Sequence, residues 1–116
     1  MVTKGSVASD STLIARSVQD YIERNPLKPG KYAAKRIYAG PQAQITEIAF
    51  DAGVELPDHK ARTPILVQVI DGAVDFTIGS EIHYLEAGGL IHLEANLTHA
   101  VYAKHPARIT VTFLSN

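Results

Sequence analysis

Gly53-Val54-Glu55-Leu56-Pro57-Asp58-His59 and Gly88-Gly89-Leu90-Ile91-His92-Leu93-Glu94-Ala95-Asn96-Leu97-Thr98-His99 are the two stretches that decide the fold of this chain. Each stretch begins with glycine and ends with histidine, and the first is followed by a further glycine, Gly72. Short segments rich in β-formers, separated by turn residues, surround both stretches. This arrangement predicts an all-β sandwich or barrel.

Two tight turns divide the middle of the chain. Asp71-Gly72 separates residues 65–70 from residues 73–78, and Gly79-Ser80 separates the second segment from residues 81–86. A two-residue turn that contains glycine between two strand-like segments is typical of a β-hairpin. The sequence therefore predicts a three-stranded meander here.

The apolar pattern of the other segments predicts which of their faces are buried. Residues 74–78 and 109–113 alternate apolar and polar side chains, so each predicts a strand with one buried face. Residues 65–70 are apolar on both faces apart from Gln68, which predicts a central strand covered on both sides. Residues 44–50 mix both kinds of side chain and predict a further strand.

The N-terminal part differs from the rest. Residues 1–12 are small and polar, which predicts a flexible tail, and residues 13–116 then form a single domain. Apolar residues within 13–22 predict a short helical turn, for which Ser17 and Asp20 form a capping box. Asn25-Pro26 ends that turn, because the residue before proline is pushed out of the helical region.

Composition excludes several classes of function. The chain has 116 residues, 11 basic against 12 acidic side chains and no cysteine. The near balance of charge gives no field that would attract nucleic acid or an anionic membrane surface. Without cysteine, only His, Asp and Glu remain as notable metal ligands. No apolar run approaches 18 residues and no signal-peptide core is present, so we expect a cytoplasmic protein that binds neither nucleic acid nor membrane.

The two opening stretches resemble the two motifs of the cupins, G-x5-H-x-H-x3-E-x6-G and G-x5-P-x-G-x2-H-x3-N. The resemblance covers about residues 44–114 and implies a double-stranded β-helix, or jelly-roll barrel, with a short N-terminal helical turn. In cupins, four side chains of these motifs hold one divalent metal inside the barrel. Those four positions fall here on His59, Ala61, Ile65 and His99.

Two of the four ligand positions have therefore lost their ligand. Alanine and isoleucine donate nothing to a metal, and they turn a charged coordination sphere into an apolar cavity with two polar groups. The first hypothesis is a stand-alone cupin that binds a small molecule in its barrel, with weak metal binding or none. The residues expected to line this pocket are His59, Ala61, Ile65, Val67, His99 and Val101.

The alternative is a metal-dependent cupin enzyme of the dioxygenase or isomerase kind. His59, His99 and a third ligand, for which His92 is the candidate, would hold one transition metal: iron, nickel, manganese or zinc. Residues 90–93 are apolar on both faces, so alternation does not settle which way His92 points. The direction in which His83 points, on the preceding strand, is likewise not settled by the sequence. No residue is assigned a catalytic role by the sequence.

The sequence also predicts the placement of Glu47 and Tyr102 and the backbone conformation of Asn96. Glu47 is the one carboxylate whose strand is able to face the barrel, although a charge facing outward at a sheet edge is the commoner case. Tyr102 falls on the face opposite His99 by strand alternation, which favours a packing role. Asn96 replaces a motif glycine, and asparagine tolerates the left-handed conformation expected there.

Self-association is also expected. A chain this short gains buried surface by pairing with a second copy, and an edge strand offers unpaired backbone groups for that purpose. Residues 31–40, with Tyr32, Ile37 and Tyr38, are the predicted contact segment of a homodimer.

Overall fold

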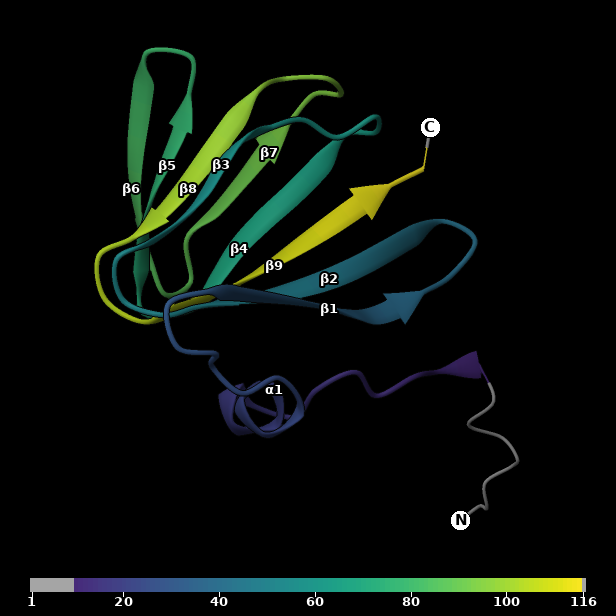
Figure 1. The fold of residues 1–116 in the computed structure, drawn as a ribbon. Helices are drawn as coiled ribbons and strands as arrows, with labels where there is room; N and C mark the ends of the chain where they lie inside the picture. Colours follow the sequence, from purple (N-terminus) through teal and green to yellow (C-terminus); the bar gives the residue numbers. More distant parts are fainter. Residues whose placement is uncertain (1–9, 116) are drawn as a thin grey trace.

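Two antiparallel sheets face each other in the computed structural model, which describes residues 10–115, and one helix lies outside them (Figure 1). The larger sheet has the strand order β1-β2-β9-β4-β7, and the smaller has the order β3-β8-β5-β6. The elements are α1 (Val18–Arg24), β1 (Tyr32–Ala39), β2 (Ala43–Phe50), β3 (Val54–His59), β4 (Ile65–Asp71), β5 (Ala73–Ile78), β6 (Glu81–Glu86), β7 (Leu90–Leu93), β8 (His99–Ala103) and β9 (Ala107–Leu114). The predicted all-β jelly-roll architecture is confirmed.

The core fills the space between the two sheets. Its cluster of buried side chains includes Phe50, Val69, Phe76 and Ile109, each at most 1% exposed. Both sheets contribute, as the alternating segments predict, and β9 is buried over most of its length because it lies at the centre of the larger sheet. The interior between the sheets is therefore packed with apolar side chains.

The predicted three-stranded meander is wrong. β5 and β6 do form a hairpin, but β4 belongs to the other sheet, where it pairs with β7 and β9. Gly72 is the corner at which the chain changes sheets: its φ is 74°, and a Cβ there would lie 2.5 Å from the carbonyl oxygen of Pro106. The turn residues were therefore identified correctly, but a sheet corner and a hairpin share the same local signal.

The helix lies later in the chain than predicted and lacks the predicted capping box. α1 spans seven residues and ends at Arg24, directly before Asn25-Pro26, as expected. Ser17 is extended and its side chain makes no capping bond, whereas the Asp20 carboxylate accepts hydrogen bonds from the backbone and side chain of Arg16. The predicted flexible tail falls mostly on residues 1–9, which lie outside the described residues.

A buried ion pair fastens the segment around α1 to the outer face of the larger sheet. Glu47 is 0% exposed, and its carboxylate accepts hydrogen bonds from Arg108 at 3.1 Å and from the Asn25 amide at 2.8 Å. Arg108 also donates to the carbonyl oxygens of Tyr21 and Asn25. Burial raises the pKa of Glu47, while Asn25 and Arg108 act in the opposite direction. Neither predicted position of Glu47, facing the barrel or exposed at an edge, is correct.

None of the helices within residues 10–115 is long and apolar enough to cross a membrane.

Candidate functional site

A bulge in β3 brings the two motif histidines together. Leu56 pairs with Val101 and His59 pairs with His99, so three steps along β3 match two steps along β8. The extra residue reverses the alternation of β3, and His59 consequently lies on the same side of the sheet as His99. Pro57, within the bulge, has no backbone N–H to give to the ladder, which suits an irregular position.

The two imidazole rings are in contact. Their centroids lie 4.1 Å apart with an angle of 59° between the ring planes. In each ring Nδ1 lies against a carbonyl oxygen two residues earlier, that of Pro57 at 3.1 Å and that of Leu97 at 3.0 Å. A carbonyl oxygen only accepts, so each Nδ1 carries a hydrogen, and in the neutral ring Nε2 then presents its lone pair. The site therefore offers a pair of acceptor nitrogens.

The two histidines differ in their surroundings. His59 is exposed, whereas His99 is 4% exposed and stacks on Phe76 with ring centroids 5.4 Å apart. Burial lowers the pKa of His99 below its ordinary value of 6.5, the neighbouring His59 lowers it further, and the Leu97 carbonyl and Asp58 oppose both effects. His99 is therefore held neutral near pH 7, with its Nε2 lone pair available.

The residues present do not fit a cupin metal centre. Within residues 10–115 there is no group of three or more His, Cys, Asp or Glu side chains placed to hold a metal. Ile65 occupies the carboxylate position and is 2% exposed, and Ala61 occupies the position of the middle histidine. Two imidazoles alone leave a first-row metal with too few protein ligands for a resident site.

His92 is not a third ligand, and that prediction is corrected. Its neighbours on β7, Ile91 and Leu93, pack into the core, and Leu93 is 1% exposed. His92 itself is exposed. His83 is half-buried on β6, opposite Phe76 of β5. Its Nε2 atom lies 3.2 Å from the Glu81 carboxylate, which is its polar partner. Neither histidine joins the pair.

The predicted pocket is only partly present. Val67 and Val101 face the interior as expected, but each is 1% exposed and both, like Ile65, belong to the packed core cluster. These three side chains are therefore packed into the core with almost no exposed surface, which does not match the predicted lining of an apolar pocket. The accessible part of the site is formed by His59, with Ala61 half-buried beside it.

A cavity that the sequence analysis missed opens at the same end of the sandwich. It has a volume of about 370 Å³ and is lined by residues 40–44, 61–63 and 113–115. The cavity lies close to the histidine pair. Ala61 is part of its lining, and Ala61 follows His59 by two residues, which span at most roughly 7 Å. The backbone N–H of Asn96, whose φ of 68° confirms the predicted left-handed turn, donates to the Ala61 carbonyl and fixes this loop.

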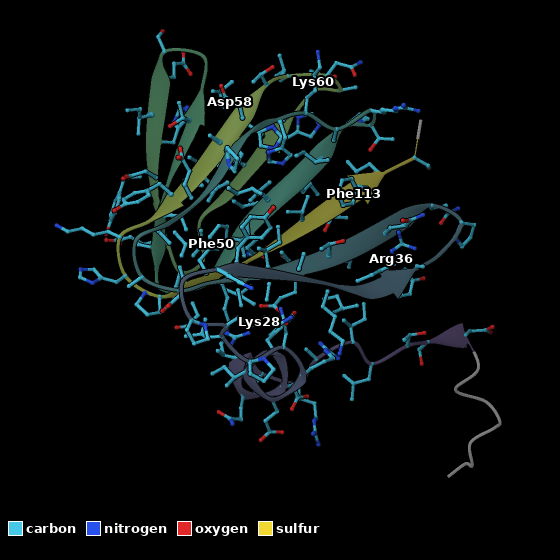
Figure 2. All side chains as sticks on the ribbon, viewed as in Figure 1. Lys28, Arg36, Phe50, Asp58, Lys60 and Phe113 are labelled. Carbon is cyan, nitrogen blue, oxygen red and sulfur yellow. The ribbon has the colours of Figure 1, made fainter. Side chains whose placement is uncertain are left out.

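The lining of this cavity is mostly apolar, with a few polar side chains and one positive charge. Arg62 and the amides of Gln42 and Gln44 contribute donors, and the buried Thr63 hydroxyl has no hydrogen-bond partner among the described residues. Figure 2 shows Asp58 and Lys60, which flank His59 in the sequence, at this end of the sandwich, together with Phe113 at the end of β9. Arg62, the one basic residue between the two lost ligand positions, was the sequence signal for the cavity.

Comparisons with known proteins identify the fold. No family model matches the chain, and no curated protein does. Among solved structures, a conserved protein of unknown function from Streptococcus pyogenes is similar with a TM-score of 0.75 and 19% identity over 91% of this chain and 93% of that one. An RmlC-like cupin from Shewanella frigidimarina is similar with a TM-score of 0.70 and 18% identity, over 79% of this chain and 83% of that one.

A third similar structure is a cupin 2 conserved barrel domain protein from Leptotrichia buccalis. It gives a TM-score of 0.73 and 26% identity over 80% of this chain, which spans 45% of that longer protein. Across these structures the likeness is one of fold.

Proposed function

We propose, from the cupin fold of this chain, that it binds a small hydroxy acid at the end of the barrel where His59 and His99 meet. The observation that carries the proposal is the pair of Nε2 atoms left free by the Nδ1 contacts to Pro57 and Leu97. A ligand hydroxyl is able to donate to one of these nitrogens. The cavity beyond Ala61 offers Arg62 for a carboxylate.

The charge of the site favours this class of ligand. The 370 Å³ cavity has a cationic residue and no acidic residue in its lining, so an anionic group gains there without meeting a like charge. His99 is neutral near pH 7 because burial lowers its pKa below the ordinary value. A molecule with a hydroxyl next to a carboxylate matches an acceptor pair beside a cation.

The proposal assigns the histidines to binding and not to metal-dependent catalysis. The second and third of the family's four ligand positions are the apolar residues Ala61 and Ile65, and no described side chain replaces them. A general base also needs an orienting partner and a reacting group within hydrogen-bond reach, and among the described residues these rings hydrogen-bond only to backbone carbonyls.

Three probe molecules test the contributions of the histidine pair and of Arg62 separately. Lactate carries both groups, propionate lacks the hydroxyl, and propane-1,2-diol lacks the carboxylate. Titration followed by the ring C–H signals of the histidines in NMR spectra is expected to show lactate binding at least about tenfold more tightly than either other molecule, a difference of about 1.4 kcal/mol. Equal affinity for all three would overturn the proposal.

Matched variants locate the binding. His59→Ala and Arg62→Gln, both at exposed positions, are each expected to weaken lactate binding by about tenfold. His105→Ala, in the turn between β8 and β9 at the far end of the sandwich, is the control and is expected to bind lactate normally. Unchanged binding by both site variants would contradict the placement.

A further inference from the structure

A row of two tyrosines and one aspartate crosses the outer face of the smaller sheet. Asp75 on β5 pairs with Tyr84 of β6 on one side and with Tyr102 of β8 on the other. Directly paired residues in neighbouring strands project from the same face. Phe76, next to Asp75, is in the core, so this row lies on the face directed away from the core. The two aromatic side chains therefore flank the carboxylate.

The row forms one wall of a second cavity. This cavity has a volume of about 470 Å³, and Lys104 and His105, from the turn between β8 and β9, line it together with residues 72–75. The corner at Gly72 and the turn between β8 and β9 are packed against each other, because a side chain at Gly72 would meet the carbonyl oxygen of Pro106. The cavity is thus built on three strands and a fixed corner, and its size is that of a small-molecule site.

Its polar and aromatic groups are not used elsewhere among the described residues. Tyr84 is 65% and Tyr102 38% exposed. No hydrogen bond or ion pair within residues 10–115 occupies the side chains of Asp75, Lys104 or His105. Tyr102 lies on the opposite face of β8 from His99, so the cavity is separate from the histidine site.

We propose that this cavity is a binding site for a neutral sugar ring. Among the residues that line the cavity, Asp75 and Lys104 carry opposite charges, so the lining favours a ligand without net charge. Sugar hydroxyls both donate to a carboxylate and accept from an ammonium group. The C–H bonds on one face of a sugar ring carry slight positive charge, which suits the negative face of a tyrosine ring.

An organic cation fits the same groups less well. A quaternary ammonium would gain from the two tyrosine faces and from Asp75. Lys104 lines the same cavity, however, and a like charge at close range opposes such a ligand. The sugar is therefore the occupant to which the charges point.

Tyrosine fluorescence reports on this site, because two of the five tyrosines line the cavity and the chain has no tryptophan to mask their emission. Titration of the full chain with glucose, galactose, maltose and cellobiose is expected to change the emission saturably for at least one sugar. Tyr84→Ser, Tyr102→Ser and Asp75→Asn are each expected to weaken that binding by about tenfold or more. Choline is the probe for the cationic alternative.

Ile82→Ser is the matched control, since Ile82 is 68% exposed on the same strand as Tyr84 and does not line the cavity. It is expected to leave sugar binding unchanged. Saturable binding of choline but of no sugar would overturn the proposal. So would a molecular mass in solution that falls on Tyr84→Ser without sugar binding by the parent chain, because a second copy would then cover this face.

Discussion

The rings of His59 and His99 lie 4.1 Å apart, although one is exposed and the other is 4% exposed. The contact arises from a bulge in β3 that places His59 opposite His99 in the register of β3 and β8. Each ring hydrogen-bonds to a backbone carbonyl oxygen, but only the ring of His99 is buried and stacked on Phe76. The pair therefore divides into a buried histidine that supports the fold and an exposed one that meets the solvent.

This division predicts unequal effects on stability. His99→Ala removes a ring stacked on Phe76 and is expected to lower the free energy of unfolding by about 2–5 kcal/mol, the range for truncating large buried side chains. His59→Ala is expected to change it by less than about 0.5 kcal/mol, as for other exposed positions. Urea denaturation followed by circular dichroism measures both, and equal losses would contradict the division.

Stability is expected to depend on pH through His99. Its pKa is lower in the folded chain than the ordinary 6.5, so the unfolded chain binds more protons between these two values. The free energy of unfolding is therefore constant above about pH 7 with respect to this group, and falls as the pH drops through 6.5 toward the lowered pKa. Urea denaturation from pH 8 to pH 5 checks this, and His99→Asn is expected to flatten that part of the profile.

Metal binding is expected to be weak, and one substitution is expected to strengthen it. The parent chain has two imidazoles at the site, and Ala61→His adds a third at the position where cupins carry one. Calorimetric titration with Ni²⁺ is expected to show at least about tenfold tighter binding for Ala61→His than for the parent chain. Ala61→Asn is the control of similar polarity without an imidazole. Tight stoichiometric binding by the parent would refute the view that its donor set is incomplete.

The Glu47–Arg108 pair is expected to show strong coupling. Arg108→Met leaves a buried carboxylate without its cationic partner and is expected to lower the free energy of unfolding by about 3–5 kcal/mol. Glu47→Leu is expected to cost a similar amount, and the double variant much less than the sum of the two. Additive losses in urea denaturation would show that the two side chains act independently.

A homodimer through β1 stays a prediction. Within residues 10–115, β1 is an edge strand of the larger sheet and pairs only with β2, and Tyr32 on it is 41% exposed. Light scattering coupled to size-exclusion chromatography is expected to give twice the mass of the chain, and Tyr38→Asp is expected to shift that mass toward the monomer. Tyr84→Ser, on the other sheet, serves as the control, and a mass unaffected by Tyr38→Asp would exclude this segment as the contact.

Local pattern and motif spacing were sufficient for the class of fold. The alternation within residues 74–78 and 109–113 identified two strands with a buried face, and the motif glycines and histidines predicted a cupin fold, which the similarity to solved cupin structures confirms. The turn at Asp71-Gly72 was also found, but not its role. A hairpin and a sheet corner need the same left-handed glycine, so only the pairing of β4 with β7 and β9 distinguishes them.

The sequence by itself determined that this chain has an all-β fold of the cupin kind, with histidine at two of the four motif ligand positions, because strand periodicity and motif spacing are local properties. Only the tertiary structure decided that His59 meets His99, that His92 faces away and that Glu47 is buried against Arg108. The physical reason is that strand register and the bulge at Pro57 set which side chains share a face, and both depend on pairing between distant segments.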